Sequence, residues 1–210
     1  LEMGEYLTGQ RAITAELGIT EREAAEALEE TSVKVEKHFD KKATPYFLEE
    51  THIDRIIAAI IYYATKYGVK VFGIDYFQLI EGHGDGEYQA LTAASKALKR
   101  VANNHNVSII LMCQIKQDCY QNTEFNLNMI KNTSGIGQDI DVAIFGCHLQ
   151  KINKYSLTVE GNRFSKPSLD NLFLFQTNKN RLGDWNRTPY FAYFDTARHR
   201  FRDTEDGDLI

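Results

Sequence analysis

The order of apolar segments along the chain allows few folds. Within the 210 residues, amphipathic helical patterns alternate with three short apolar runs: VKVFGID at 69–75, VSIILMCQ at 107–114 and DVAIFGC at 141–147. Continuous apolar strands of this length, separated by helices, are typical of parallel sheets that helices cover on both faces. The pattern therefore predicts an α/β fold with a mostly parallel central sheet flanked by helices.

The helical segments carry start and stop signals. Thr20 and Glu23 form a T-x-x-E capping box at the start of a helix. Gly68 supplies a stop after the first apolar stripe, and NNHN at 103–106 ends the second. Two sets of apolar residues at helical spacing define the buried faces: Ile53, Ile56, Ile57, Ile60, Ile61 and Ala64, then Leu91, Ala94, Leu98, Val101 and Ala102.

The carboxyl-terminal part alternates polar stretches with aromatic ones. NLFLFQTNKNR (171–181) and TPYFAYFDTARHRFR (188–202) predict a β-hairpin or meander. The polar insert 148–170 is interpreted as a disordered surface loop, with a partner site as the alternative. We expect one partial domain over residues 1–210, made of a helical lead-in (1–68), a sheet core (69–203) and a short tail (204–210).

Composition narrows the setting. Three cysteines without a C-x-x-C pair argue against a disulfide framework or a zinc knuckle and favour a reducing, intracellular compartment. No apolar stretch approaches the ~18 residues that a membrane helix needs. The net charge of −5 gives no support for non-specific nucleic-acid binding, although a few lysines can still gather in one channel. The chain opens LEMGEYL, without an initiator methionine, so we interpret it as a fragment or a processed piece.

Polar residues follow two of the predicted strands. Asp75, Gln78 and Gln114 fall at or just past carboxyl ends, where open α/β sheets bind their ligands. The Asp75 carboxylate suits Mg²⁺, which prefers oxygen ligands and keeps several waters; the alternative is an aspartate that starts a turn. Gln114 can sense a phosphate through its amide, or it can be an ordinary polar strand end.

Two cations lie near the end of the next predicted strand. Alternation along a strand places Lys179 and Arg181 on the same side. Together they can clamp a phosphate, because arginine supplies a planar two-pronged donor. The alternative is an exposed hairpin tip with solvated charges. The segment EGHGDGE (81–87) holds acids and a histidine, but its glycines make it unlike a preorganised metal site.

Taken in order, five segments resemble the motifs of the motor domain of DnaB-family replicative helicases, which is RecA-like. The resemblance spans residues 1 to about 203 and rests on LEM (1–3), GIDYFQLI (73–80), CQIK (113–116), SGIGQDIDVAIF (134–145) and NKNRLG (178–183). These are similar to the family's S-L-E-M segment, its Walker B strand, its S-Q-L-N motif, its G-S-I-E-Q-D-A-D motif and its K-x-R-N-G hairpin. The implied function is an ATP-dependent, ring-forming helicase motor that translocates on single-stranded DNA.

The resemblance implies a role for each matching residue. Glu2 is expected to polarise the attacking water as general base, and Asp75 to hold Mg²⁺. Gln114 is expected to contact the γ-phosphate of ATP. Lys179 and Arg181 are expected to reach the nucleotide of a neighbouring subunit, as a finger acting in trans within a homohexamer.

The resemblance also implies DNA contacts and partners. Channel loops at 81–87 and roughly 117–134 are expected to hold the backbone of single-stranded DNA, with Lys116, Lys131 and the amides of Thr133, Ser134 and Gly135 as candidates. Primase and a helicase loader are the expected protein partners. The expected location is the cytoplasm of a bacterial or phage-infected cell, away from membranes.

One motif of the family is missing. No G-x-x-x-x-G-K-[ST] loop occurs in the 210 residues, so the chain lacks the amides and lysine that cradle phosphates. We therefore expect no ATPase activity from this chain alone. Two alternatives remain open: a RadA-like recombinase, which fits the motifs less well, and a non-catalytic RecA-like module that acts as a binding or regulatory protein.

Overall fold

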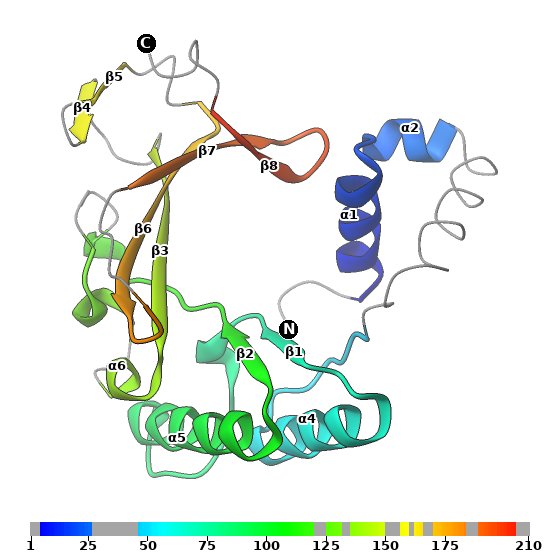
Figure 1. The fold of residues 1–210 in the computed structure, drawn as a ribbon, viewed down its shortest axis with the longest axis vertical. Helices are drawn as coiled ribbons and strands as arrows, with labels where there is room; N and C mark the ends of the chain where they lie inside the picture. The colour runs from blue at the N-terminus through cyan, green and yellow to red at the C-terminus, as the bar shows by residue number, and fades with distance from the viewer. Residues whose placement is uncertain are drawn as a thin grey trace. The chain divides into compact units, whose positions relative to one another are not determined.

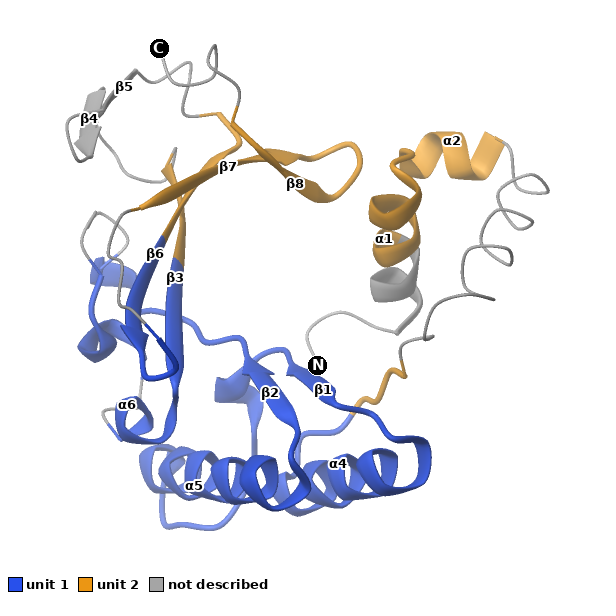
Figure 2. Cartoon of the chain, viewed as in Figure 1, with its two compact units in different colours: residues 1–2, 50–145, 176–188 blue, residues 3–49, 146–175, 189–210 orange. Residues whose placement is uncertain are grey.

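The computed structural model describes residues 5–26, 46–119, 125–131, 135–149, 156–159, 162–165, 170–183 and 189–204. The chain divides into two compact units (Figure 2). Unit 1 comprises residues 1–2, 50–145 and 176–188, and unit 2 comprises residues 3–49, 146–175 and 189–210.

A pair of parallel strands lies at the centre of unit 1. β1 (Val71–Ile74) pairs with β2 (Ser108–Leu111), and Ile74 lies opposite Leu111 at the carboxyl end of the pair. Helices α4 (Ile53–Tyr67) and α5 (Glu87–His105) contact each other and lie along one face of these strands (Figure 1). Val71 of β1 and Ile110 of β2 are 59% and 50% exposed. Among the described residues, helices therefore cover only one face of this strand pair.

The two helices follow the predicted patterns. Ile53, Ile56 and Ile60 are the buried residues of α4, and Leu91, Ala94, Ser95, Leu98 and Val101 are those of α5. Gly68 ends α4 in the left-handed region at φ 69°, as predicted. Asn106 caps α5 with φ 51°, so the helix ends at Asn106, the last residue of the NNHN segment in which the break is predicted.

A second sheet has four strands in the order β3-β6-β7-β8. Its strands are β3 (Val142–His148), β6 (Leu172–Asn180), β7 (Tyr190–Asp195) and β8 (Arg200–Asp203), and both the β6–β7 and the β7–β8 pairs are antiparallel. The predicted carboxyl-terminal meander is therefore confirmed. Gly146 admits the Phe175 ring, because a Cβ at residue 146 would lie 2.9 Å from its Cε1.

Unit 2 begins with two helices. α1 runs over Glu5–Leu17 and α2 over Glu21–Glu26. The predicted capping box is confirmed at the start of α2: the Thr20 amide donates to Glu23 Oε2 at 2.7 Å, and the Glu23 amide donates to Thr20 Oγ1 at 3.1 Å. The rest of the helix predicted after residue 26 lies outside the described residues.

The insert 148–170 is a correction to the sequence prediction. Instead of a loop throughout, it contains the antiparallel pair β4 (Ser156–Val159) and β5 (Asn162–Ser165), joined by two residues. Two strands this short carry too few apolar residues to register as strands in a polar sequence. None of the described helices combines the length and the hydropathy that a membrane-spanning segment requires.

Candidate functional site

The carboxyl edge of the β1–β2 pair is a fixed platform. The Met112 amide donates to the Ile74 carbonyl at 3.0 Å, and the Phe77 amide donates to the Met112 carbonyl at 2.8 Å. Phe77 is fully buried in the short 3-10 helix η1 (Phe77–Leu79), which directly follows this edge. The residues after β1 and those after β2 are therefore held together, as predicted for Asp75 and Gln114.

Asp75 is exposed at this edge. Among the described residues no group of three or more acidic, cysteine or histidine side chains forms a protein cage for a metal. A single exposed carboxylate nevertheless fits Mg²⁺, because this ion is commonly held by one or two carboxylates together with waters and substrate phosphates. Asp75 is thus suited to a metal that arrives with its nucleotide.

Gln78 connects three parts of the edge. Its Oε1 accepts a hydrogen bond from the Gln114 amide at 3.1 Å. Its Nε2 donates to the carbonyl of Gln114 at 3.2 Å and to the carbonyl of Lys131 at 3.3 Å. One side-chain amide therefore links the end of β2 to the backbone of Lys131, which lies 53 residues after Gln78 in the sequence.

Residues 114–116 and 129–131 form a short antiparallel ribbon. Ile115 and Ile130 form an isolated bridge; beside it, the Lys116 amide donates to the Met129 carbonyl at 2.8 Å, and the Lys131 amide to the Gln114 carbonyl at 3.0 Å. Ile130 is buried on the inner side. Side chains alternate across such a ribbon, and the outer side carries three exposed residues: Gln114, Lys116 and Lys131.

The base of the segment 125–131 is fixed separately. The ring of Phe125 stacks on that of Phe145, with centroids 5.5 Å apart. The Phe125 amide donates to Gln176 Oε1 at 3.2 Å, and Asn178 Nδ2 donates to the Phe125 carbonyl. These contacts anchor the segment to β6, while Gln78 holds its other end.

Lys179 and Arg181 lie beside the short helix α6 (Ile136–Asp139). Lys179 Nζ donates to the Gly137 carbonyl at 2.5 Å. The Arg181 amide donates to the Asp141 carbonyl at 2.9 Å, and its guanidinium lies 4.0 Å from Asp141 Oδ1. Asp141 also pairs with Lys99 Nζ at 2.5 Å. Burial of the ammonium, followed by the nearby Arg181 charge, lowers the pKa of Lys179, and the Asp141 carboxylate opposes this shift.

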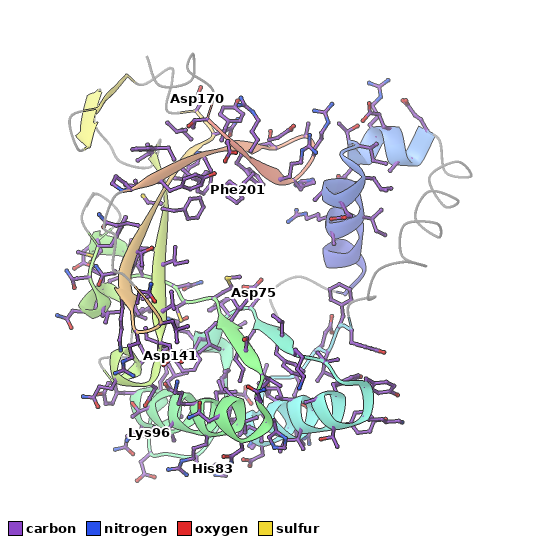
Figure 3. The ribbon with its side chains drawn as sticks, viewed as in Figure 1. Asp75, His83, Lys96, Asp141, Asp170 and Phe201 are labelled. Atoms are coloured by element: carbon purple, nitrogen blue, oxygen red, sulfur yellow. The ribbon has the colours of Figure 1, made fainter. Side chains whose placement is uncertain are left out.

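The candidate residues thus form two groups. Asp75, Gln114, Lys116 and Lys131 share one edge, whereas Lys179 and Arg181 contact α6 and Asp141. Figure 3 shows Asp75 and Asp141 at separate places in unit 1. Among the described contacts, none joins either cation to Asp75 or Gln114. Glu2, Thr133 and Ser134 lie outside the described residues, and Gly135 is the residue before α6.

Sequence reasoning assigned no role to two residues of this region. From the sequence, Gln78 is only a polar residue near a strand end. The one pattern that points to its hydrogen bonds is its position three residues after Asp75 in the same motif. Asp141 lies within SGIGQDIDVAIF, and nothing in its spacing indicates that it pairs with Lys99 and Arg181.

The glycine-rich segment 81–87 is fixed at its start. The Ile53 amide donates to the Glu81 carbonyl and the Glu81 amide to the Thr51 carbonyl, both at 2.9 Å. His83 Nε2 lies 2.9 Å from Asp54 Oδ2 at the start of α4. These contacts hold the segment next to the first turn of α4.

The chain is similar to solved structures and matches a protein-family model. The chain aligns with a structure titled "The Structure Of A DnaB-Like Replicative Helicase And Its Interactions With Primase" with a TM-score of 0.76 and 18% identity, over 97% of this chain and 49% of that one. It aligns with a second structure, described as an ATPase domain, with a TM-score of 0.73 and 18% identity, over 97% of this chain and 72% of that one. No curated protein sequence matches the chain.

These likenesses establish a RecA-like α/β fold, as predicted. The family model described as "DnaB-like helicase C terminal domain" matches residues 1–203. The chain therefore belongs to the DnaB-like helicase C-terminal domain family. It spans about half the length of the first of the two solved structures.

Proposed function

We propose that these residues form the motor portion of an ATP-dependent, ring-forming replicative helicase that moves along single-stranded DNA and unwinds duplex. The observation that carries the proposal is the carboxyl edge of the β1–β2 pair, where Asp75 follows β1 and Gln114 follows β2. Gln114 continues into the ribbon that carries Lys116, and its carbonyl accepts a hydrogen bond from the Lys131 amide at 3.0 Å. An amide suited to a nucleotide is there connected through the backbone to two lysines suited to the phosphates of a DNA strand.

At the nucleotide, the residues divide the work. Asp75 is the residue that would hold Mg²⁺, which would neutralise charge on the phosphate oxygens. Gln114 hydrogen-bonds the terminal phosphate, and Glu2 polarises the attacking water. Phosphoryl transfer depends on such positioning and charge stabilisation, because the protein contributes little covalent chemistry.

The separation of the two groups favours a finger acting in trans. Lys179 and Arg181 are held against Gly137 and Asp141, apart from Asp75 of the same chain. In a homohexamer they would serve the nucleotide of a neighbouring subunit. Arginine fingers of this kind contribute about 10³–10⁵ in rate, so hydrolysis would require assembly.

Single-stranded DNA would bind the exposed side of the ribbon through its phosphates. Lys116 and Lys131 supply charge there, and the amides of Thr133, Ser134 and Gly135 are further candidates. Such binding tolerates any sequence and weakens with salt. Channel loops 81–87 and 117–134 would line the path.

For the whole protein we propose primase and a helicase loader as partners, in the cytoplasm of a bacterial or phage-infected cell. The support for primase is a similar solved structure, described as a DnaB-like replicative helicase and its interactions with primase. The 210 residues contain no G-x-x-x-x-G-K-[ST] loop. We therefore expect that this chain alone does not hydrolyse ATP and that activity requires a phosphate-cradling loop in the same protein.

Mixing subunits tests the proposal. In the protein that carries this chain, Arg181→Ala subunits should bind nucleotide normally yet reduce the DNA-stimulated ATPase of wild-type rings more than in proportion to their share. Arg55→Ala is the matched control, because Arg55 is an exposed arginine paired with Glu50 at 3.5 Å. Mixing Arg55→Ala subunits into wild-type rings should not lower the ATPase rate by more than their share. Wild-type ATPase in a pure Arg181→Ala hexamer would refute the trans finger.

A second function has one observation in its favour. The missing phosphate-cradling loop fits a non-catalytic RecA-like module that acts as a binding or regulatory protein. Equilibrium binding of Mg²⁺–ATP to the protein that carries this chain separates the two. Absence of binding would favour the module and overturn the motor.

A further inference from the structure

Gln78 uses its side-chain amide on backbone groups from two segments. Nε2 donates two hydrogen bonds, one to the Gln114 carbonyl at 3.2 Å and one to the Lys131 carbonyl at 3.3 Å. Oε1 accepts from the Gln114 amide at 3.1 Å. The main chain of Gln114 is therefore held on both its N–H and its C=O by one side chain, which also holds Lys131.

The support behind Gln78 is rigid. Gln78 is the central residue of η1, flanked by the fully buried Phe77 and followed by Ile80, which is 5% exposed. The Phe77 amide is bound to the Met112 carbonyl at 2.8 Å, and η1 begins two residues after Asp75. A movement of Gln114 against this fixed point must break or carry along the bonds to Gln78, and with them the bond to Lys131.

We infer that Gln78 is a positioning residue that couples the nucleotide side of the edge, at Gln114, to the DNA side, at Lys131. The inference rests on the proposed motor function. Gln78 itself touches neither ligand in this scheme. It transmits a shift of Gln114, made when the terminal phosphate is bound or lost, to the backbone of Lys131.

Glutamine fits this position for reasons that other residues do not meet. Asparagine is one methylene shorter and cannot reach both segments. Glutamate keeps the acceptor for the Gln114 amide but has no donor, so its carboxylate would face two carbonyl oxygens. Methionine keeps the length and loses every hydrogen bond. These differences make Gln78→Glu and Gln78→Met a matched pair of variants, one repulsive and one neutral.

The test measures coupling in the protein that carries this chain. The affinity for a dT oligonucleotide is measured by fluorescence anisotropy, with Mg²⁺ and either a non-hydrolysable ATP analogue or ADP. We expect a wild-type affinity ratio between these states within the ~5–150-fold range typical of coupled sites. Gln78→Met and Gln78→Glu should lower this ratio toward one, with a remainder carried by the direct bond from the Lys131 amide to the Gln114 carbonyl. Affinity in the ADP state should change less, because Lys116 and Lys131 remain.

Gln176→Met is the control. It removes the same kind of side-chain contact to the segment 125–131, where Gln176 Oε1 accepts from the Phe125 amide at 3.2 Å, but it leaves the link to Gln114 intact. The ratio should persist in this variant. If Gln176→Met loses the ratio as fully as Gln78→Met does, general loosening of the segment explains the effect and the coupling role of Gln78 is refuted.

The outcomes separate the inference from the function on which it rests. A normal wild-type ratio that Gln78→Met retains would refute the coupling alone. A wild-type ratio near one would refute the proposed motor and the coupling with it. Hydrogen exchange gives a readout that does not depend on ligands: in folded Gln78→Met, the Gln114 amide should exchange faster, and unchanged protection there would contradict the observed bond.

Discussion

Cys113 lies one residue before Gln114, and its thiol is partly buried at the same edge of the sheet. Burial raises the pKa of its thiol from 9.0 to about 11. Its Sγ lies 4.0 Å from the Leu111 carbonyl, at the end of β2. Because the thiolate is the reactive form, this shift slows alkylation of Cys113 at any pH below its folded pKa.

The same shift makes stability depend on pH. The folded pKa is above the unfolded one, so Cys113 contributes its full stabilisation below about pH 9, and that contribution is lost as the pH rises through about 11. We expect the free energy of unfolding of wild type, measured with urea, to fall more steeply over this interval than that of Cys113→Ala, by about 2 kcal/mol in total. Parallel curves for the two proteins would contradict the burial of this thiol.

At the level of single residues, the sequence indicated positions better than contacts. Asp75 and Gln114 were predicted at one edge because parallel strands end together, and the β1–β2 pairing bears this out. The link between Gln78 and Lys131 could not be predicted, because it joins residues 53 apart through a bridge that exists only in the folded chain. Lys179 was expected beside Arg181, but its bond to the Gly137 carbonyl depends on where α6 lies.

Helix α4 ends through the conformation of one residue. Gly68 adopts φ 69°, and its amide donates to the Tyr63 carbonyl. A side chain is strained in this left-handed region, so Gly68→Ala should lower the free energy of unfolding by about 1 kcal/mol. Chemical denaturation of both proteins measures the difference.

Gly73→Ala is the matched control for this substitution. Gly73 lies in β1, outside the left-handed region, and a Cβ there would meet no atom within 4 Å. Its replacement should leave stability unchanged or raise it slightly, because alanine restricts the unfolded chain. Equal losses for both variants would mean that the φ of Gly68 is not the cause.

Elements with continuous apolar runs were predictable from the sequence, whereas short elements in polar stretches were not. The apolar runs at 69–75, 107–114 and 141–147 coincide with β1, β2 and β3 to within a few residues at their ends. The strands β4 and β5 are as short as β1 and β2 but lie in a polar stretch, and the four-residue helix α6 has too few residues to show a helical period. Their positions come from tertiary contacts, such as the 2.8 Å bond from Ser95 Oγ to Asp139 Oδ2 that fixes the end of α6 against α5.

Asp141 illustrates how elements position a site residue. Its carboxylate holds Lys99 of α5, and its carbonyl accepts from the Arg181 amide just past β6. A partly buried carboxylate between cations keeps their side chains in place while offsetting their repulsion. The finger proposed for Arg181 therefore starts from a fixed backbone.

Over the whole molecule, the net charge is unfavourable for the proposed binding of DNA. The chain has a net charge of −5, yet the proposed function requires it to hold the phosphates of a nucleic acid. The two properties are compatible only when binding is confined to a few well-placed cations. Lys116 and Lys131 meet this condition, because both are exposed on one side of the ribbon 114–116 and 129–131.

This confinement predicts the salt dependence of DNA binding in the protein that carries the chain. Each phosphate contact on single-stranded DNA contributes about −0.7 to the slope of log affinity against log salt concentration. Lys131→Gln should therefore make the slope shallower by about 0.7, for any sequence of oligonucleotide. Lys70→Gln is the control, because Lys70 is exposed just before β1, at the opposite edge of the same parallel pair; it should leave the slope unchanged. An equal change for both lysines would indicate a diffuse response to net charge, and no change for Lys131 would remove it from the DNA path.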